Sequence, residues 1–468
     1  SEIPKLHGQT IGFRSFLKTT TYSKLTFEYH HMEEFRRGGD LLNRPPHEAN
    51  VAEQTEHSIN GGGLKFDYFS PNENHRFNVF ASAQHINRDS YYGPGDRDPL
   101  DAYGNTTDLN WMAGSQYVYS FGKCIFMPSD LTAGIEFNQD KLEDNMWGYN
   151  RTVDQKVNIG SAFLQNEWKN DHWGFLIGGR LDKHNLIDHV IFSPRANLRY
   201  NPTENINLRF SYSSGFRAPQ AFDEDLHVEN VGGNVAMVEL ADNLKEERSQ
   251  SLSASADIYH RFGAFQVNFL VEGFYTKLSD VFALTDGEVV DGILTRTRHN
   301  ASGAQVLGLT LEGKMAYLNK FQIQAGVTLQ QSHYSEPHEW NPDAPAVKKM
   351  MRTPNTYGYF TATYTPVKPL SIALSGTYTG SMLVPHEPVP GFLENPITVN
   401  TKDFFDIGLK AAYDFKLYKS MNLQLNAGIQ NIFNAYQDDF DKGADRDSGY
   451  IYGPSLPRSF FAGVKISY

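Results

Sequence analysis

In the stretch SFFAGVKISY, residues 459–468, apolar residues alternate with polar or small ones. The residues between the apolar positions are polar or small, with Phe461 as the one exception. Alternation with a period of two indicates a β-strand that has one apolar and one polar face. The apolar positions are Phe460, Ala462, Val464, Ile466 and Tyr468.

The same alternation recurs along most of the sequence. Clear examples are residues 206–213, 321–330, 370–379, 405–415 and 421–430. The polar positions hold Gln, Asn, Ser, Thr and Gly, a composition that suits a water-filled interior. The other face is aliphatic in the middle and aromatic near the strand ends, which is typical of a sheet that faces lipid.

The predicted strands number about nineteen, and short links alternate with long links between them. Short turns on one side and long loops on the other are typical of an outer-membrane barrel. An open sheet edge is unfavourable in lipid, so we expect the sheet to close. The sequence therefore predicts an all-β fold, an antiparallel transmembrane β-barrel. The expected strands are 8–17, 22–36, 55–68, 75–88, 108–121, 130–143, 154–169, 172–184, 190–200, 205–217, 245–261, 265–279, 296–317, 321–334, 355–365, 370–384, 402–417, 421–436 and 457–468.

Composition excludes several other classes of protein. No stretch approaches 18 consecutive apolar residues, so transmembrane helices are not expected. The net charge of −12 argues against a nucleic-acid partner. The single cysteine, Cys124, excludes a disulfide framework and a cysteine-based zinc site. The first ten residues do not form a signal peptide, so either a signal was removed or the chain is a piece of a longer one.

Several motifs together resemble TonB-dependent outer-membrane receptors. The turn NIFN at 431–434 and the segment GPSLPR at 453–458 lead into the last strand, as in the C-terminal region of that family. GFRAP at 215–219 is similar to a mid-barrel motif, and 243–260 is similar to the strand that follows it. The segment 34–62 resembles an early external loop of Bacteroidetes-type receptors. By this resemblance, Phe460 and Tyr468 belong to the C-terminal signature of the family.

The resemblance implies a 22-strand barrel filled by an N-terminal plug, yet no plug is recognisable in this chain. Counted back from the last strand, nineteen strands begin at the fourth. We therefore interpret residues 1–468 as the barrel domain of a receptor that lacks its plug and its first three strands.

The resemblance also implies a function in the bacterial outer membrane. External loops would bind a scarce, bulky solute, and the TonB complex would act through a plug to import it into the periplasm. A ferric siderophore or haem is expected first, and cobalamin is close behind. The barrel is expected to be no enzyme and to need no cofactor. Alternatives are a passive porin-like channel and, less favoured, an outer-membrane enzyme on the barrel rim.

Candidate ligand-binding residues lie in the predicted external loops. Arginines there could attract an anionic chelate, aromatic rings could stack on a flat ligand, and loop 218–244 is rich in acidic residues and histidine. These candidates are Arg36, Arg37, Tyr91, Tyr92, Trp147, Asp223, Asp225, His227, Trp340 and Phe392. The histidines of the predicted external loops include His47, His338 and His386, but no pair has the helical spacing of metal ligands.

Two loops carry closely spaced acidic residues. Asp96, Asp98 and Asp101 lie in a Gly/Pro-rich segment and could hold Ca²⁺, although the pattern is not an EF-hand. Asx turns explain the same residues without a metal. The segment 438–449 raises the same question of calcium binding.

The barrel is expected to lie in outer-membrane lipid, and a surface lipoprotein is a possible further partner.

Overall fold

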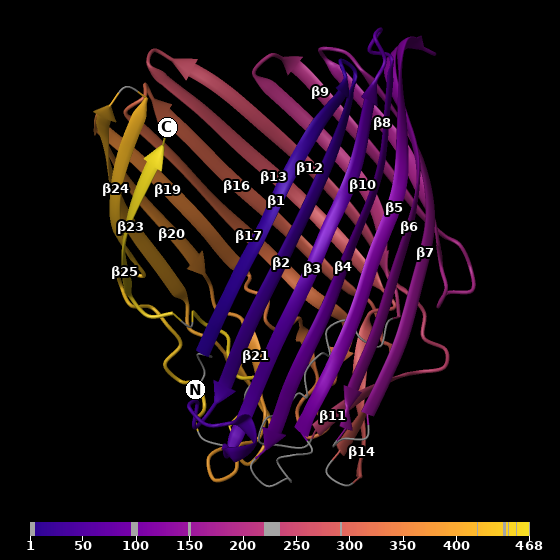
Figure 1. Ribbon diagram of the computed structural model, residues 1–468, viewed down its shortest axis with the longest axis vertical. Helices are drawn as coiled ribbons and strands as arrows, with labels where there is room; N and C mark the ends of the chain where they lie inside the picture. Colours follow the sequence, from indigo (N-terminus) through magenta and orange to yellow (C-terminus); the bar gives the residue numbers. More distant parts are fainter. Residues whose placement is uncertain are drawn as a thin grey trace.

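The computed structural model describes residues 5–467 except 95–101, 148–150, 220–234, 291–292, 419, 443–445, 448 and 455. One sheet of twenty strands forms the wall of the barrel (Figure 1). Each wall strand is hydrogen-bonded to the next, except that β18 and β19 both pair with β17. All of these pairings are antiparallel, as the period-two pattern predicts. No helix long and apolar enough to cross a membrane occurs in the described part of the chain.

The wall strands are long, and many exceed the five or six residues usual in globular sheets. They are β1 (Lys5–Thr20), β2 (Ser23–Gly39), β3 (Val51–Phe69), β4 (His75–Pro94), β5 (Tyr103–Cys124), β6 (Met127–Met146), β7 (Arg151–Lys169), β8 (Trp173–His184), β9 (Ile191–Thr203), β10 (Ile206–Arg217), β12 (Glu247–Phe262), β13 (Phe265–Ser279), β16 (Ala304–Tyr317), β17 (Phe321–His338), β18 (Val347–Lys349), β19 (Thr356–Val367), β20 (Leu370–Thr379), β23 (Phe404–Tyr418), β24 (Met421–Gln430) and β25 (Ser459–Ser467).

Two smaller sheets and a short 3₁₀ helix are built from the long loops. The first sheet has the order β11-β15-β14, and the second pairs β21 with β22. Figure 1 shows long loops gathered at the end where β1 begins, and tight turns at the other end. The additional elements are η1 (Pro46–Glu48), β11 (Val235–Leu240), β14 (Phe282–Val290), β15 (Ile293–Asn300), β21 (Leu383–His386) and β22 (Ile397–Asn400).

The register separates the two faces of the wall. One row of paired residues crosses from β2 to β6 and is mostly apolar, whereas the adjacent row is polar from β2 to β5 and reaches Gly134 on β6. The apolar row runs Leu25, Phe66, Val79, Ser115 and Ile135. The polar row runs Lys24, Asp67, Asn78 and Gln116.

The apolar rows are exposed to the surroundings of the barrel. Ile11 is 72% exposed, Ile135 is 62% exposed and Val464 is 66% exposed. A continuous apolar surface of this extent is unfavourable in water and favourable against acyl chains. The polar rows therefore face the interior, and the transmembrane barrel predicted from the sequence is confirmed.

Apart from the three-residue β18, the wall contains nineteen strands, the number expected from the sequence. One predicted strand, 296–317, is wrong: its first part is β15, which lies in a separate sheet, and β16 begins only at Ala304. The chain leaves the wall at Gly303, where a Cβ would lie 2.3 Å from the carbonyl oxygen of Leu278. Glycine is the residue that permits this close approach.

Other predicted boundaries are also corrected. The strand predicted for 370–384 ends at Thr379, and the strand predicted for 421–436 ends at Gln430. After Gln430 the backbone turns, with Asn431 at φ +49° and Asn434 at φ +54°. Asparagine tolerates this left-handed region better than most residues, so the segment NIFN is a turn rather than the end of a strand.

In the described part of the chain, β1 pairs only with β2 and β25 pairs only with β24. Every residue of β1 is exposed. Both strands run toward the end with the tight turns (Figure 1). The two edges of the sheet are therefore parallel to each other and carry unpaired backbone groups.

Candidate functional site

Buried side chains are concentrated among the long loops and the strand ends that support them. One cluster contains Tyr91, Tyr92 and Met146, a second contains Ile187 and Ile191, and a third contains Met382, Val384 and Tyr450. The interior of the wall, by contrast, is lined by polar side chains. The loops therefore pack into an ordered layer at one end of the barrel, which is where a bound solute would find a preformed surface.

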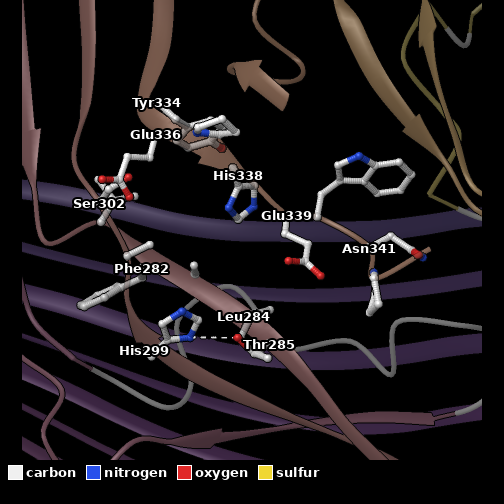
Figure 2. A pocket seen from close by; sticks show the side chains of 16 residues that line it. Phe282, Leu284, Thr285, His299, Ser302, Tyr334, Glu336, His338, Glu339 and Asn341 are labelled. Atoms are coloured by element: carbon white, nitrogen blue, oxygen red, sulfur yellow. Dashed lines mark hydrogen bonds between the residues drawn. The ribbon is translucent and has the colours of Figure 1, made fainter. Parts of the chain in front are cut away.

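A cavity of about 360 Å³ lies in this layer (Figure 2). The hairpin β14–β15 forms one side, and the end of β17 with the segment after it forms the other. We call this cavity the rim pocket. It is lined by Val281–Thr285, His299, Ala301, Ser302, Tyr334 and Glu336–Pro342.

The rim pocket combines apolar rings with a few polar groups, the composition that ligand sites in proteins favour. Phe282, Tyr334 and Trp340 supply aromatic rings. The indole Nε1 of Trp340 is buried and has no hydrogen-bond partner among the described residues. A buried donor of this kind is costly unless a ligand or water accepts its hydrogen bond.

Histidines and carboxylates complete the lining. Figure 2 shows His299 and His338 approaching the pocket from its two sides. His299 Nδ1 lies 3.3 Å from Thr285 Oγ1, and the ring of His338 lies 4.8 Å from the ring of Tyr334. Glu336 and Glu339 border the same space. The pocket can therefore both donate and accept hydrogen bonds to a solute.

Two arginines and a glutamate that do not line the pocket stabilise its β14–β15 side. Arg217 lies over the ring of Phe282 at 5.4 Å, and Arg298 lies over the same ring at 5.8 Å. The carboxylate of Glu247 accepts a hydrogen bond from the backbone nitrogen of Phe282 and lies 3.6 Å from Arg217. Cation–π contacts and a charged acceptor fix this ring in place. Arg217, in the segment GFRAP, thus has a structural contact.

His338 is the last residue of β17, beyond the part of the strand that spans the membrane. Burial lowers the pKa of His338, and the nearby His299 lowers it further. The unfolded chain would protonate this ring near pH 6.5, while the folded chain resists protonation. Stability should therefore fall as the pH drops below about 6.5, and His338→Gln should reduce that loss. The test is to measure the unfolding free energies of the parent and of His338→Gln between about pH 5 and pH 8, the range in which histidine titrates. An identical pH dependence of the two proteins would contradict the prediction.

A second group of buried polar residues braces the loop after β24. His386 Nε2 lies 2.9 Å from Asp441 Oδ2, and the His386 ring stacks on Tyr450 at 3.7 Å with an interplanar angle of 6°. The hydroxyl of Tyr452 donates to Asp439 at 2.6 Å. Burial, followed by the adjacent Asp439 carboxylate, raises the pKa of Tyr450 to about 12. These contacts join the loop to the β21–β22 hairpin.

Contacts within the chain account for most of the acidic residues in the segment 438–449. Asp438 pairs with Lys402 at 2.8 Å, and Asp447 accepts from the backbone nitrogens of Glu387 and Gly449. Among the described residues, no group of three or more His, Cys, Asp or Glu side chains could hold a metal ion. Asp96, Asp98 and Asp101 lie outside the described residues, so calcium binding there stays a prediction.

Those of the predicted ligand-binding residues that the structure describes do not meet at one place. Trp340 lines the rim pocket, whereas Trp147 and Phe392 are exposed elsewhere. Arg36 is exposed and bonded to Glu34 at 2.6 Å. Arg37 is buried and donates to the backbone oxygens of Gly38 and Asp40.

Tyr91 and Tyr92 were expected in a loop, but β4 extends to Pro94 and both rings are buried. The ring of Tyr91 packs edge-on against Tyr103 at 4.8 Å. Phe460 is 74% exposed on β25, on the apolar face. Asp223, Asp225, His227 and Tyr468 lie outside the described residues.

Phe282, His299, Tyr334 and Glu336 were missed by the sequence reasoning. Phe282 was placed in a long loop and His299 in a continuous wall strand. Their proximity depends on the break at Gly303, which folds the β14–β15 hairpin over the end of β17. His338 is among the predicted loop histidines, but no sequence spacing links it to His299.

Comparisons with known proteins agree with this architecture. The family model described as "TonB dependent receptor-like, beta-barrel" matches residues 7–432. A search of curated proteins found no match. Among solved structures, a mutant of the ferric enterobactin receptor PfeA from Pseudomonas aeruginosa is 16% identical, with a TM-score of 0.74 over 98% of this chain and 69% of that chain.

Two further structures are similar to the same extent. The siderophore receptor PirA from Acinetobacter baumannii is 14% identical, with a TM-score of 0.72 over 98% of this chain and 70% of that chain. The outer membrane transporter YddB from Escherichia coli is 10% identical, with a TM-score of 0.73 over 98% of this chain and 68% of that chain. At these identities the similarity shows a shared fold.

Proposed function

Because the chain belongs to the TonB-dependent receptor-like β-barrel family, we propose that it captures a bulky solute at its long loops and imports it into the periplasm. The chain resides in the bacterial outer membrane. Receptors of this family bind small-molecule nutrients and interact with TonB. The first candidate for the solute is a ferric siderophore, because siderophore receptors are among the similar structures. Haem and cobalamin follow as alternatives.

The observation that carries this proposal is the rim pocket. It lies among the long loops, which face the outside in barrels of this kind. Its aromatic rings and its buried indole donor match a flat or ring-bearing solute with hydrogen-bond acceptors. The exposed candidates Arg36, Trp147 and Phe392 do not line it and would contact a solute only at its periphery.

We also propose that residues 1–468 form one barrel domain that three further strands complete. Over the residues that the structure describes, nineteen long strands leave both edges unpaired and parallel to each other. An antiparallel barrel closes such edges only with an odd number of additional strands, and lipid strongly disfavours leaving them open. Three strands give the family's 22, and a plug would then fill the polar interior. The similarity of residues 34–62 to receptors of Bacteroidetes type supports a source in that group.

A non-enzymatic role is part of the proposal. The family and the similar structures are receptors and transporters. A passive channel is the competing function, because most side chains of the interior wall are polar. The channel would need neither energy nor a preformed solute pocket.

Binding of a panel of ferric siderophores, haem and cobalamin to the complete receptor tests the proposal. Trp340→Phe removes the indole donor and should weaken binding of the cognate solute by about fivefold, the equivalent of one hydrogen bond. Trp111→Phe is the matched control, because that indole already donates to Gln139 in the wall. Equal affinities for both variants and the parent would place the solute elsewhere.

A further inference from the structure

The tight turn between β5 and β6 differs from most of the other tight turns in exposing two large apolar residues side by side. Ile125 is 80% exposed and Phe126 is 53% exposed. Other turns at the same end consist largely of polar residues, such as Asn170–His172 and Glu204–Asn205. Two adjacent exposed apolar side chains are unfavourable in water, so their surroundings need an explanation.

The backbone of this turn is also strained. Ile125 has φ +64°, a region that a β-branched residue rarely adopts. The backbone nitrogen of Phe126 donates to the carbonyl oxygen of Cys124 at 2.8 Å, which closes the turn tightly around Ile125. Two-residue hairpin loops with a positive φ favour glycine, asparagine or aspartate. The conformation therefore favours a different residue, and the isoleucine contributes an apolar side chain instead.

The turn is fixed against the neighbouring strand β7. The ring of Phe126 stacks on Trp168 at 5.6 Å with an interplanar angle of 16°. Trp168 Nε1 donates to the carbonyl oxygen of Cys124 at 3.0 Å. Asn170 lies against Met127, at the far end of the turn. These contacts hold the ring of Phe126 and the backbone of the turn in a defined direction.

Trp168 connects the turn to a belt of aromatic rings. Trp168 is paired with Phe175, and Trp173 is paired with Tyr200. The ring of Trp173 stacks on Phe175 at 5.6 Å and on Tyr200 at 4.2 Å. By strand alternation Trp168 shares its face with Leu164, which is 56% exposed on the apolar side of the wall. The belt therefore faces lipid, at the level where aromatic girdles lie.

We propose that Ile125 and Phe126 insert into the phospholipid leaflet on the periplasmic side and anchor the barrel at that interface. Phe126 extends the lipid-facing belt below the last residues of the wall, and Ile125 projects beyond it. The occupant is an acyl-chain surface because the turn is continuous with a surface that already faces acyl chains.

Site-directed spin labelling of the complete receptor in phospholipid vesicles tests this. A nitroxide is attached at Phe126→Cys in a background with Cys124→Ser and any other cysteine replaced. Asn319→Cys, in the turn between β16 and β17, is the matched reference. Accessibility to molecular oxygen, which concentrates in lipid, is compared with accessibility to a water-soluble nickel chelate. The label at position 126 should favour oxygen, and the label at position 319 should favour nickel.

Two outcomes would overturn the proposal. If the label at position 126 is as accessible to the nickel chelate as the label at position 319, the turn lies in water. If neither reagent reaches it, protein covers the turn.

A second measurement avoids labels. Ile125→Asn combined with Phe126→Ser should lower the denaturant midpoint of the receptor in vesicles. Leu318→Asn, at an exposed residue with φ +47° in the β16–β17 turn, should not lower it. Equal midpoints for the two variants would contradict an anchoring role.

Discussion

Replacing Ile135 with arginine should destabilise the folded barrel by about 2–4 kcal/mol, the penalty for a cationic side chain near the middle of a lipid-facing strand. Ile135 lies on β6 in the apolar row and is 62% exposed to the surroundings. In the membrane that surface meets acyl chains, which cannot solvate a guanidinium group. Equilibrium unfolding of the complete receptor in phospholipid vesicles gives the difference in free energy.

The matched control is Gln116→Arg, because Gln116 lies in the polar row one position away in the register. An arginine there reaches the interior of the barrel and should change the stability little. If the two substitutions have equal effects, or if Gln116→Arg is the more damaging, the assignment of the two faces is reversed or wrong.

The second large effect concerns a buried ion pair beneath the long loops. Asp144→Ala should lower the free energy of unfolding by about 3–5 kcal/mol, because it leaves the guanidinium of Arg88 buried without its charged partner. Asp144 is 1% exposed and Arg88 is 7% exposed. The two are joined directly at 3.5 Å and through Thr106, whose hydroxyl donates to Asp144 at 2.6 Å and accepts from Arg88 at 2.7 Å.

Denaturant unfolding of single and double variants separates the causes. Arg88→Met combined with Asp144→Ala removes both charges and should recover much of the lost stability. The control pair is Lys402 and Asp438, which is closer, at 2.8 Å, but exposed. Asp438→Ala should have little effect, since solvent already screens that pair. A loss as large for Asp438→Ala as for Asp144→Ala would show that burial is not the deciding factor.

The strands of the wall could be predicted from the sequence because each one has two unlike faces. Apolar and polar residues alternate with a period of two wherever one face of a strand meets lipid and the other meets water, as along 321–330. This alternation is lost where both faces are covered by other residues. Tyr91 and Tyr92 illustrate this: they follow a polar run, precede a Gly/Pro-rich segment and resemble a loop, yet they continue β4 into the packed layer of strand ends.

The site could not be predicted to the same degree, because its contacts join residues far apart in the chain. Phe282 is held by Arg217, and His386 is held by Asp441. Neither pair has a spacing that sequence patterns record. Trp340 was identified as an aromatic residue of an external loop, but its neighbours in the rim pocket depend on how the β14–β15 hairpin folds back.

The most direct test of the account is the accumulation of labelled ferric siderophores by cells that carry the complete receptor, with and without a working TonB complex. Accumulation should occur only when the complex is present, and Trp340→Phe should reduce it at low solute concentration. Equal accumulation without the complex would contradict energised import and would identify the barrel as a passive channel.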